Sequence, residues 1–309
     1  MVETRKPIVV VGSVTMDLVT RTPRIPAIGE TLIGIGFDTT PGGKGANQAV
    51  AAARLGYPVA MVGKVGDDVY GPALLANLAR AGVDTSAMEQ AEGSSGLAPM
   101  FVSASGENSI VVVPGANGKV DRGVVDRHAN LIRSAGMVLC QLEIPMDTLS
   151  YTLAFCAEAG VPVMLDPAPA ADLPASVWEQ VAWFTPNETE TDLYVWGSLS
   201  PEESAKMLLK SGLHGVVLKR GEDGAYVAVQ DGRGDWVKPF KVAAIDTVAA
   251  GDCFNGAFAV ALLEGQDPWA AARFANAAAA ICVTRKGAAA SMPTRAEVDA
   301  FLAGQAGPD

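Results

Sequence analysis

Short apolar runs alternate with amphipathic stretches along the second half of the chain. From about residue 137 the runs VLCQLE, VPVMLDP, AWFTPN and GVVLKRG follow one another, most of them separated by stretches with helical periodicity. Strands of a parallel sheet are apolar along their whole length because helices cover both faces. The pattern, which IVVVGS (8–13) begins, therefore predicts an α/β fold with a mostly parallel central sheet and crossover helices.

Two early regions break this alternation. TLIGIGFD (31–38) is strand-like, and LAPMFVSA and SIVVVPG (97–104 and 109–115) resemble a hairpin joined by SGEN. We expect a small β-sheet within residues 14–40 and 95–115. It would act as a lid over the carboxyl ends of the main strands, where ligands bind in open α/β sheets. The Ala-rich final third is predicted to be helical, and we predict one domain over residues 1–309, with disorder confined to the chain ends.

Composition supports a packed, acidic protein. Hydrophobic residues make up 49% of the 309 residues, the formal net charge is −11, and the four cysteines form no CxxC pair. A nucleic-acid-binding surface needs clustered Lys and Arg, so that function is not expected. The cysteines are expected to be buried core residues, which fits a reducing compartment. No run is long enough for a membrane span, and the first residues lack a signal-peptide pattern, so we expect a cytoplasmic protein.

Several catalytic motifs are absent from the sequence. It contains no GxxxxGK[ST] loop, no GxGxxG and no GxSxG, and its two histidines give no zinc-ligand spacing. Polar residues instead follow the predicted strands. Glycines and Lys44 precede a helix in PGGKGANQA, Glu143 ends QLE, and Asn187 and Glu190 stand in TPNETE. Each has an ordinary structural alternative: a glycine loop, a solvated strand end and a capped helix start, respectively, while LKRGEDG could be a plain β-turn.

The segment DTVAAGDCFNGAF (246–258) places an aspartate among small residues at the start of a helix. Small residues let backbone N–H groups line an anion site at the positive end of the helix. Asp252 is then a candidate general base beside a transferring phosphoryl group. The alternative is that Asp252 is only an N-cap.

Taken together, these segments closely resemble the ribokinase family of ATP-dependent sugar kinases. GSVTMD, PGGKGANQA, KVGDD, GANG, QLE, DPAPA, TPNETE, DTVAAGD and VTRKGA occur in the order typical of that family, over about residues 8–303. The resemblance implies a ribokinase-like three-layer α/β/α sandwich with a β lid that also forms a homodimer contact. It also implies phosphorylation of the 5-hydroxyl of ribose by ATP.

The resemblance also implies roles for individual residues. Asp252 would be the catalytic base, and the anion hole would comprise Ala249, Ala250 and Gly251. The sugar would be bound by Thr15, Asp17, Gly43, Lys44, Gly45, Ala46, Asn47 and Glu143 together with Asp252. The ATP site would comprise Asn187, Lys219, Arg220, Gly221, Glu222, Asp223, Gly224, Gly251 and Asn276.

Two metal ions are implied in the same way. Mg²⁺ would be organised through water by Asn187 and Glu190. An activating K⁺ would be held mostly by backbone carbonyls of a loop pair comprising Asp246, Val248, Cys282, Arg285, Gly287 and Ser291. Hard cations prefer oxygen ligands, so Cys282 would contribute its carbonyl and not its sulfur.

Two positions depart from the family pattern. Thr15 stands where many ribokinases have Asn, and Lys219-Arg220 replaces a frequent Thr-Leu. Thr has a shorter side chain and a different donor–acceptor set, so the preferred sugar is open. The first hypothesis is a ribose kinase, the second a kinase for 2-deoxyribose or another small sugar, and the third a catalytically weak sugar-binding regulatory protein.

Overall fold

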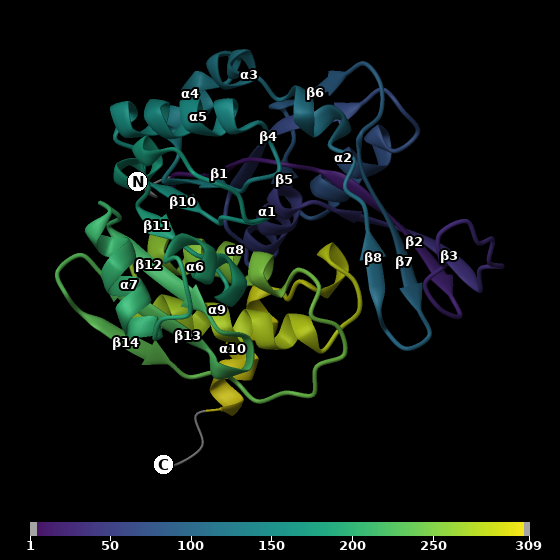
Figure 1. Ribbon diagram of the computed structural model, residues 1–309. Coiled ribbons are helices and arrows are strands. Elements are labelled where there is room, and N and C mark those ends of the chain that lie inside the picture. Colours follow the sequence, from purple (N-terminus) through teal and green to yellow (C-terminus); the bar gives the residue numbers. More distant parts are fainter. Residues whose placement is uncertain (1–4, 306–309) are drawn as a thin grey trace.

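A ten-stranded, mostly parallel sheet forms the centre of the computed structural model, which describes residues 5–305 (Figure 1). Residues 1–4 and 306–309, which include the ends where we expected disorder, lie outside the described residues. The strand order is β14 (Gly234–Val237), β13 (Ala225–Val229), β12 (Gly215–Lys219), β11 (Trp183–Phe184), β10 (Val163–Leu165), β9 (Met137–Cys140), β1 (Ile8–Val11), β4 (Val59–Gly66) and β5 (Val83–Asp84), with β6 (Met88–Ala91) also paired to β4. The β12–β13 and β13–β14 pairs are antiparallel.

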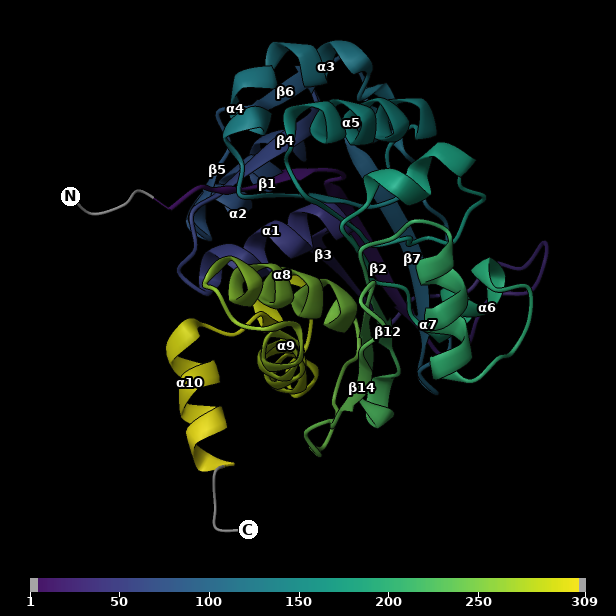
Figure 2. The same cartoon turned by 90° about the vertical axis from the view of Figure 1, so that its left-hand side faces the viewer.

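Helices cover both faces of this sheet, as Figures 1 and 2 show. One face packs against α1 (Lys44–Arg54), α2 (Gly71–Arg80), α8 (Ala250–Leu263), α9 (Pro268–Val283) and α10 (Arg295–Gly304). The other packs against α3 (Arg122–Arg127), α4 (Ala129–Ser134), α5 (Met146–Ala159), α6 (Glu188–Tyr194) and α7 (Pro201–Lys210). The predicted α/β class with a mostly parallel sheet is confirmed.

Strand β1 explains why the sheet strands have continuous apolar sequences. Ile8 and Val10 lie in one hydrophobic core, and Val9 and Val11 lie in the other. Successive side chains of a strand point to opposite faces, so a strand covered on both sides needs an apolar residue at every position. The central strands are therefore fixed in register from both faces.

A second sheet projects from the main body (Figure 1). It has four strands in the order β3 (Gly36–Gly42), β2 (Thr15–Thr22), β7 (Gly96–Ser103) and β8 (Asn108–Ile110). The strand predicted at 31–38 is wrong at its start, because β3 begins only at Gly36, opposite Arg21. Pro23 follows the end of β2 and has no N–H to donate, which limits the ladder at that end.

The predicted burial of the cysteines is confirmed, since all four are buried and free of disulfides.

Among residues 5–305, no helix is long and apolar enough to cross a membrane.

Helices α1 and α8 pack with their backbones close together. A Cβ atom added at Gly256 of α8 would lie 2.7 Å from the carbonyl oxygen of Gln48 and 3.0 Å from the backbone nitrogen of Ala52, both on α1. Backbone atoms cannot move aside as a flexible side chain can. Gly256 therefore sets the distance between these two helices.

We expect Gly256→Ala to lower the free energy of unfolding by about 1–3 kcal/mol, the usual cost of overpacking. This loss would occur although Ala is favoured over Gly inside a helix by about 1 kcal/mol. Urea denaturation measures it. The matched control is Gly304→Ala at the end of α10, where an added Cβ meets nothing within 4 Å. Equal stabilities for the two variants would contradict the packing argument.

Candidate active site

The polar residues singled out in the sequence converge at the carboxyl edge of the main sheet. Strands β1, β9, β10, β11 and β12 run parallel, so the residues that follow them meet at one edge. Ser13, Glu143, Asp166, Asn187 and Lys219 follow or end these strands. The amino-terminal ends of α1 and α8 reach the same edge, because hydrogen bonds join residues of their first turns.

Asp252 lies in the first turn of α8 and does not cap it. The N-cap is Ala249, which adopts a left-handed conformation with φ of 59° and makes no side-chain cap. The Asp252 carboxylate accepts hydrogen bonds from Asn47 Nδ2 at 3.0 Å and Gln48 Nε2 at 3.2 Å, both on α1. The N-cap alternative for Asp252 is therefore wrong.

Burial raises the pKa of Asp252 to about 6. This value includes the nearby charge of Asp166, which raises the pKa as well. It also includes the ammonium of Lys44 and the hydrogen bonds from Asn47 and Gln48, which lower it. The carboxylate is only 6% exposed. A carboxylate with such a pKa is ionised near neutral pH and is a stronger proton acceptor than an exposed aspartate.

Lys44, the first residue of α1, supplies positive charge at the centre of the site. Burial by itself would lower its pKa, but surrounding carboxylates raise it above the ordinary value, so the group stays charged. These carboxylates are Asp252, Asp166, Glu143 and Glu190. Lys44 thus lies among groups contributed by four separate segments of the chain.

Glu143 is held by the segment after β1 and by the first residue of α1. Its Oε2 accepts hydrogen bonds from Ser13 Oγ at 2.5 Å and from the backbone N–H of Lys44 at 2.9 Å. Gly43 makes this approach possible, because it has a φ of 92° and a Cβ there would lie 2.8 Å from the Thr15 nitrogen. The Oε1 atom of Glu143 makes none of these bonds and remains able to accept one from a ligand.

Asp17 lies beside Glu143 but is carried by strand β2 of the small sheet. Burial raises the pKa of Asp17 to about 6, and the charge of Glu143 raises it as well, whereas a hydrogen bond from Thr15 lowers it. That bond joins Thr15 Oγ1 to Asp17 Oδ1 at 3.2 Å. Thr15 therefore orients Asp17 and is only 5% exposed.

A cavity of about 880 Å³ adjoins the start of α8. Its lining includes residues expected to bind ATP, namely Lys219, Gly221, Glu222, Asp223, Gly224, Gly251 and Asn276. Arg220 does not line it, since its guanidinium pairs with Glu188 at 3.2 Å. The segment 221–223 forms a short 3₁₀ turn that connects β12 and β13. It is therefore a tight turn between two strands and also part of the cavity wall.

Asn187 and Glu190 are engaged with each other in a capping box at the start of α6. The backbone N–H of Asn187 donates to one Glu190 oxygen at 2.8 Å, and Asn187 Nδ2 donates to the other at 2.9 Å. The capped helix start that we considered is therefore present. Burial raises the pKa of Glu190, while the charge of Lys219 lowers it.

Asp246 joins the two loops expected to bind K⁺. Its side chain accepts hydrogen bonds from the backbone N–H of Val248 at 3.0 Å and of Gly287 at 2.9 Å. Nearby, Cys282 Sγ and Ser291 Oγ lie 3.0 Å apart, and the guanidinium of Arg285 pairs with Glu297. Asp246 and Val248 thus lie just before α8, Cys282 lies in the last turn of α9, and Arg285, Gly287 and Ser291 lie in the segment that follows α9.

Sequence reasoning missed four residues of the site. Ser13 holds Glu143, and a chain of buried side chains runs from Gln141 to Gln48 and on to Asp166. Asp166 directly follows strand β10, so its position after an apolar run was a usable signal. The glutamines gave no signal, because a polar residue on a helix or after a strand is usually solvated.

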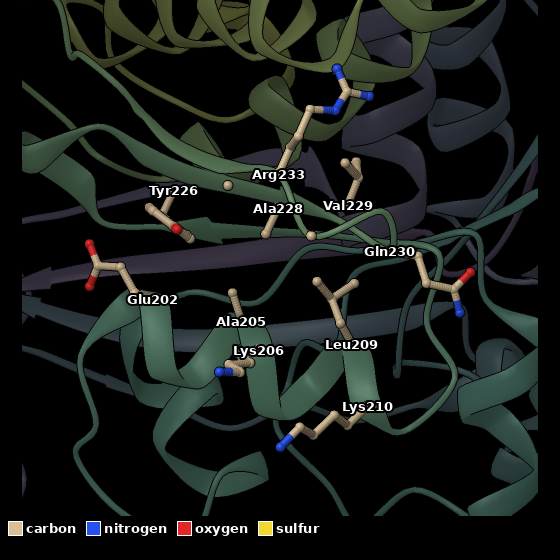
Figure 3. Close-up of a pocket in the computed structure, with 12 residues that line it drawn as sticks. Glu202, Ala205, Lys206, Leu209, Lys210, Tyr226, Ala228, Val229, Gln230 and Arg233 are labelled. Carbon is tan, nitrogen blue, oxygen red and sulfur yellow. The ribbon is translucent and has the colours of Figure 1, made fainter.

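A second cavity, of about 460 Å³, lies away from these carboxylates. Figure 3 shows it between α7, which carries Lys206 and Lys210, and the hairpin that carries Tyr226 and Arg233. Its lining contains none of the groups described above, so the edge of the sheet is the candidate active site.

Comparisons with known proteins agree with this geometry. The model of the pfkB family carbohydrate kinases matches residues 5–295. The chain is 43% identical to a ribokinase of Bacillus subtilis over 96% of this chain and 99% of that protein. It is 37% identical to a deoxyribokinase of Salmonella typhimurium, with 96% and 98% covered.

A solved structure extends the likeness to three dimensions. The structure of Arabidopsis thaliana ribokinase complexed with ribose and ATP has a TM-score of 0.92 to this protein and 34% identity, and the match covers 97% of this chain and 99% of that one. The chain belongs to the pfkB family of carbohydrate kinases.

Proposed function

We propose that this protein transfers the γ-phosphoryl group of ATP to the 5-hydroxyl of D-ribose, giving ribose 5-phosphate and ADP. The observation that carries the proposal is the buried Asp252 carboxylate, held by Asn47 and Gln48 in the first turn of α8, next to Gly251 in the lining of the 880 Å³ cavity. The names of the Bacillus subtilis relative and of the Arabidopsis thaliana complex support ribose and ATP as substrates.

In the proposed reaction, Asp252 accepts the proton of the ribose hydroxyl as its oxygen attacks the γ-phosphorus. A bond forms between that oxygen and phosphorus, and the bond to the β-phosphate oxygen breaks, releasing ADP. Backbone N–H groups of Ala249, Ala250 and Gly251 would stabilise charge on the phosphoryl oxygens. The Ala250 amide donates to the Thr247 carbonyl at 3.3 Å, a long bond that a phosphate oxygen would replace.

The sugar would lie between the main sheet and the small sheet. Asp17 and Glu143 each have one oxygen that makes none of the hydrogen bonds described above, and Asn47 Oδ1 is buried without a hydrogen-bond partner. Hydroxyl groups of a sugar would satisfy these acceptors. The backbone at Gly43, Gly45 and Ala46 would allow the sugar a close approach.

Mg²⁺ would be held through water by Asn187 and Glu190 and would offset charge on the ATP phosphates. The charges at the site fit a divalent cation. Four carboxylates surround Lys44, and the only other ammonium group described at this centre is that of Lys219. With Asp17 beside Glu143, carboxylates outnumber the ammonium groups at this centre, and a divalent cation would offset part of the excess negative charge.

The small sheet would act as a lid and as the contact of a homodimer within a single kinase domain. Apolar side chains at its edge support this, since Ile33 and Ile35 just before β3 and Phe37 on β3 are more than half exposed, at 86%, 67% and 60%. Exposed apolar patches of this kind are typical of protein interfaces. The four buried, reduced cysteines support action in the cytoplasm.

A kinase for 2-deoxyribose is the second candidate. The hydroxyl of Thr15 already donates to Asp17, so it has only acceptor capacity left for a sugar hydroxyl. The deoxyribokinase relative from Salmonella typhimurium favours the same alternative. A non-catalytic sugar-binding protein is less well supported, because it would not need a buried, ionisable Asp252.

Replacing the base tests the mechanism. We expect Asp252→Asn to bind ribose and nucleotide in calorimetry but to lower kcat by about 10²–10⁴-fold. In the unaltered protein, kcat should fall as the pH drops below about 6, because protonated Asp252 cannot accept a proton. Asp235→Asn, on exposed β14, is the matched control. Turnover of Asp252→Asn near that of this control would refute the assignment.

An ion bound at the Asp246 loops would brace the start of α8 without touching substrate. We therefore propose that K⁺ activates the enzyme and expect kcat to rise when K⁺ replaces Na⁺, with a smaller change in the KM for ribose. Asp246→Ala should reduce this response, because it removes the hydrogen bonds to Val248 and Gly287. Equal rates in the two salts at constant ionic strength would exclude the role.

The role of Thr15 is tested by two sugars in two proteins. We expect a modest preference for ribose over 2-deoxyribose, and we expect Thr15→Asn to increase it by about tenfold, which is about one hydrogen bond. Asn would supply an N–H donor in addition to a carbonyl. The measurement is kcat/KM for both sugars, and an unchanged ratio would show that Thr15 does not discriminate between them.

A further inference from the structure

A buried ion pair stands at the junction of the sugar site and the nucleotide cavity. The ammonium of Lys219 lies 2.9 Å from Asp166 Oδ1, and the two side chains are only 13% and 3% exposed. Burying two charges costs free energy that their attraction often fails to recover. The pair therefore contributes little to the free energy of unfolding by comparison with a hydrophobic pair. Stability alone does not explain why a buried ion pair lies at this position.

The Lys219 ammonium points at the proposed anion hole. A Cβ atom built on Gly251 would lie 3.4 Å from Lys219 Nζ, and this is the nearest atom such a Cβ would meet. Gly251 belongs to the first turn of α8, where N–H groups lack partners within the helix. A phosphoryl group bound by these N–H groups would lie within contact distance of the lysine.

Asp166 is tied to the proposed base as well as to the lysine. Gln48 Nε2 donates to Asp166 Oδ2 at 2.9 Å and to Asp252 Oδ1 at 3.2 Å. The backbone of Lys219 is also fixed, since its N–H donates to the carbonyl of Pro186 at 2.9 Å. One hydrogen-bonded chain thus links the proposed base, Gln48, Asp166 and the lysine.

We propose that Lys219 is a catalytic residue that contacts the transferring phosphoryl group, and that Asp166 is the positioning residue that aims it. This inference rests on the proposed kinase function and deepens it. In the absence of nucleotide, Asp166 holds the ammonium beside Gly251. As charge builds up on the phosphoryl oxygens, the Lys219 ammonium stabilises that charge.

The decisive variant is Lys219→Met, which keeps the length of the side chain and removes its charge. We expect kcat with ribose to fall by about 10²-fold, the usual effect of removing one such stabilising group, while the KM for ribose changes less than about threefold. The affinity for ADP with aluminium fluoride, Mg²⁺ and ribose should fall at least about tenfold more than the affinity for ADP alone, because the complex mimics the transition state.

Two further proteins protect this test against misfolding and nonspecific charge effects. Lys219→Met leaves Asp166 unpaired, so the double variant Lys219→Met/Asp166→Asn removes both charges and should show the same loss of kcat. Lys210→Met, exposed on α7, removes the same charge elsewhere and should keep the wild-type kcat. A double variant with wild-type kcat overturns the inference and leaves the kinase assignment standing. A wild-type protein that phosphorylates no sugar overturns both.

The role of Asp166 has its own readout in the pH profile. The titratable groups that face Asp252 are Lys44 from α1, Asp166 after β10 and the thiols of Cys253 and Cys282. The charge of Asp166 raises the pKa of Asp252, so Asp166→Asn should lower kcat and move its acid limb to lower pH. A fall in kcat without that displacement would indicate a merely structural residue and overturn the positioning role.

Discussion

The contact between α1 and α8 is the constraint on which the site depends. Both helices begin at the carboxyl edge of the sheet, and Gly256 allows their backbones to approach closely. This approach brings the amides of Asn47 and Gln48 to the carboxylate of Asp252. A buried carboxylate without such donors would cost too much free energy to stay ionised. The contact between the two helices is therefore what allows Asp252 to be ionised.

Electrostatics at the centre follow from that burial. Water would normally weaken the interactions among Lys44, Asp252 and Asp166, but these groups lie in the protein interior, where charges interact more strongly. Burial and, to a smaller extent, the charge of Asp166 raise the pKa of Asp252, whereas the ammonium of Lys44 lowers it. A proton acceptor of this strength suits an attacking hydroxyl, whose own proton leaves only as the new bond forms.

The two sheets both contribute residues to the candidate site. The main sheet and its helices hold Glu143, Asn47 and Asp252, whereas the small sheet carries Thr15 and Asp17 on β2. Strand β2 follows β1 after only three residues, so the end of the small sheet that carries Thr15 and Asp17 is anchored directly to the core. Its apolar outer residues are free to meet another surface without disturbing the reacting groups.

The sequence by itself determined the fold class and pointed to most residues of the candidate site. Apolar runs are unambiguous where strands are covered on both faces, and the motifs around Lys44, Asn187 and Asp252 are local in the chain. The start of β3 was predicted too early because the length of β3 depends on its pairing with β2. Pro23, which follows β2, limits that pairing, and the residues of β3 do not show this.

Only the tertiary structure decided how Gln48, Gln141 and Asp166 connect to Asp252 and Lys219. Their hydrogen bonds join segments up to 204 residues apart, as between Gln48 and Asp252. It also decided that Asp252 caps nothing, because an N-cap and a buried base have the same sequence context and differ only in which donors face the carboxylate. Polar side chains carry no periodic signal, so which of them are buried and paired is fixed only when the helices pack.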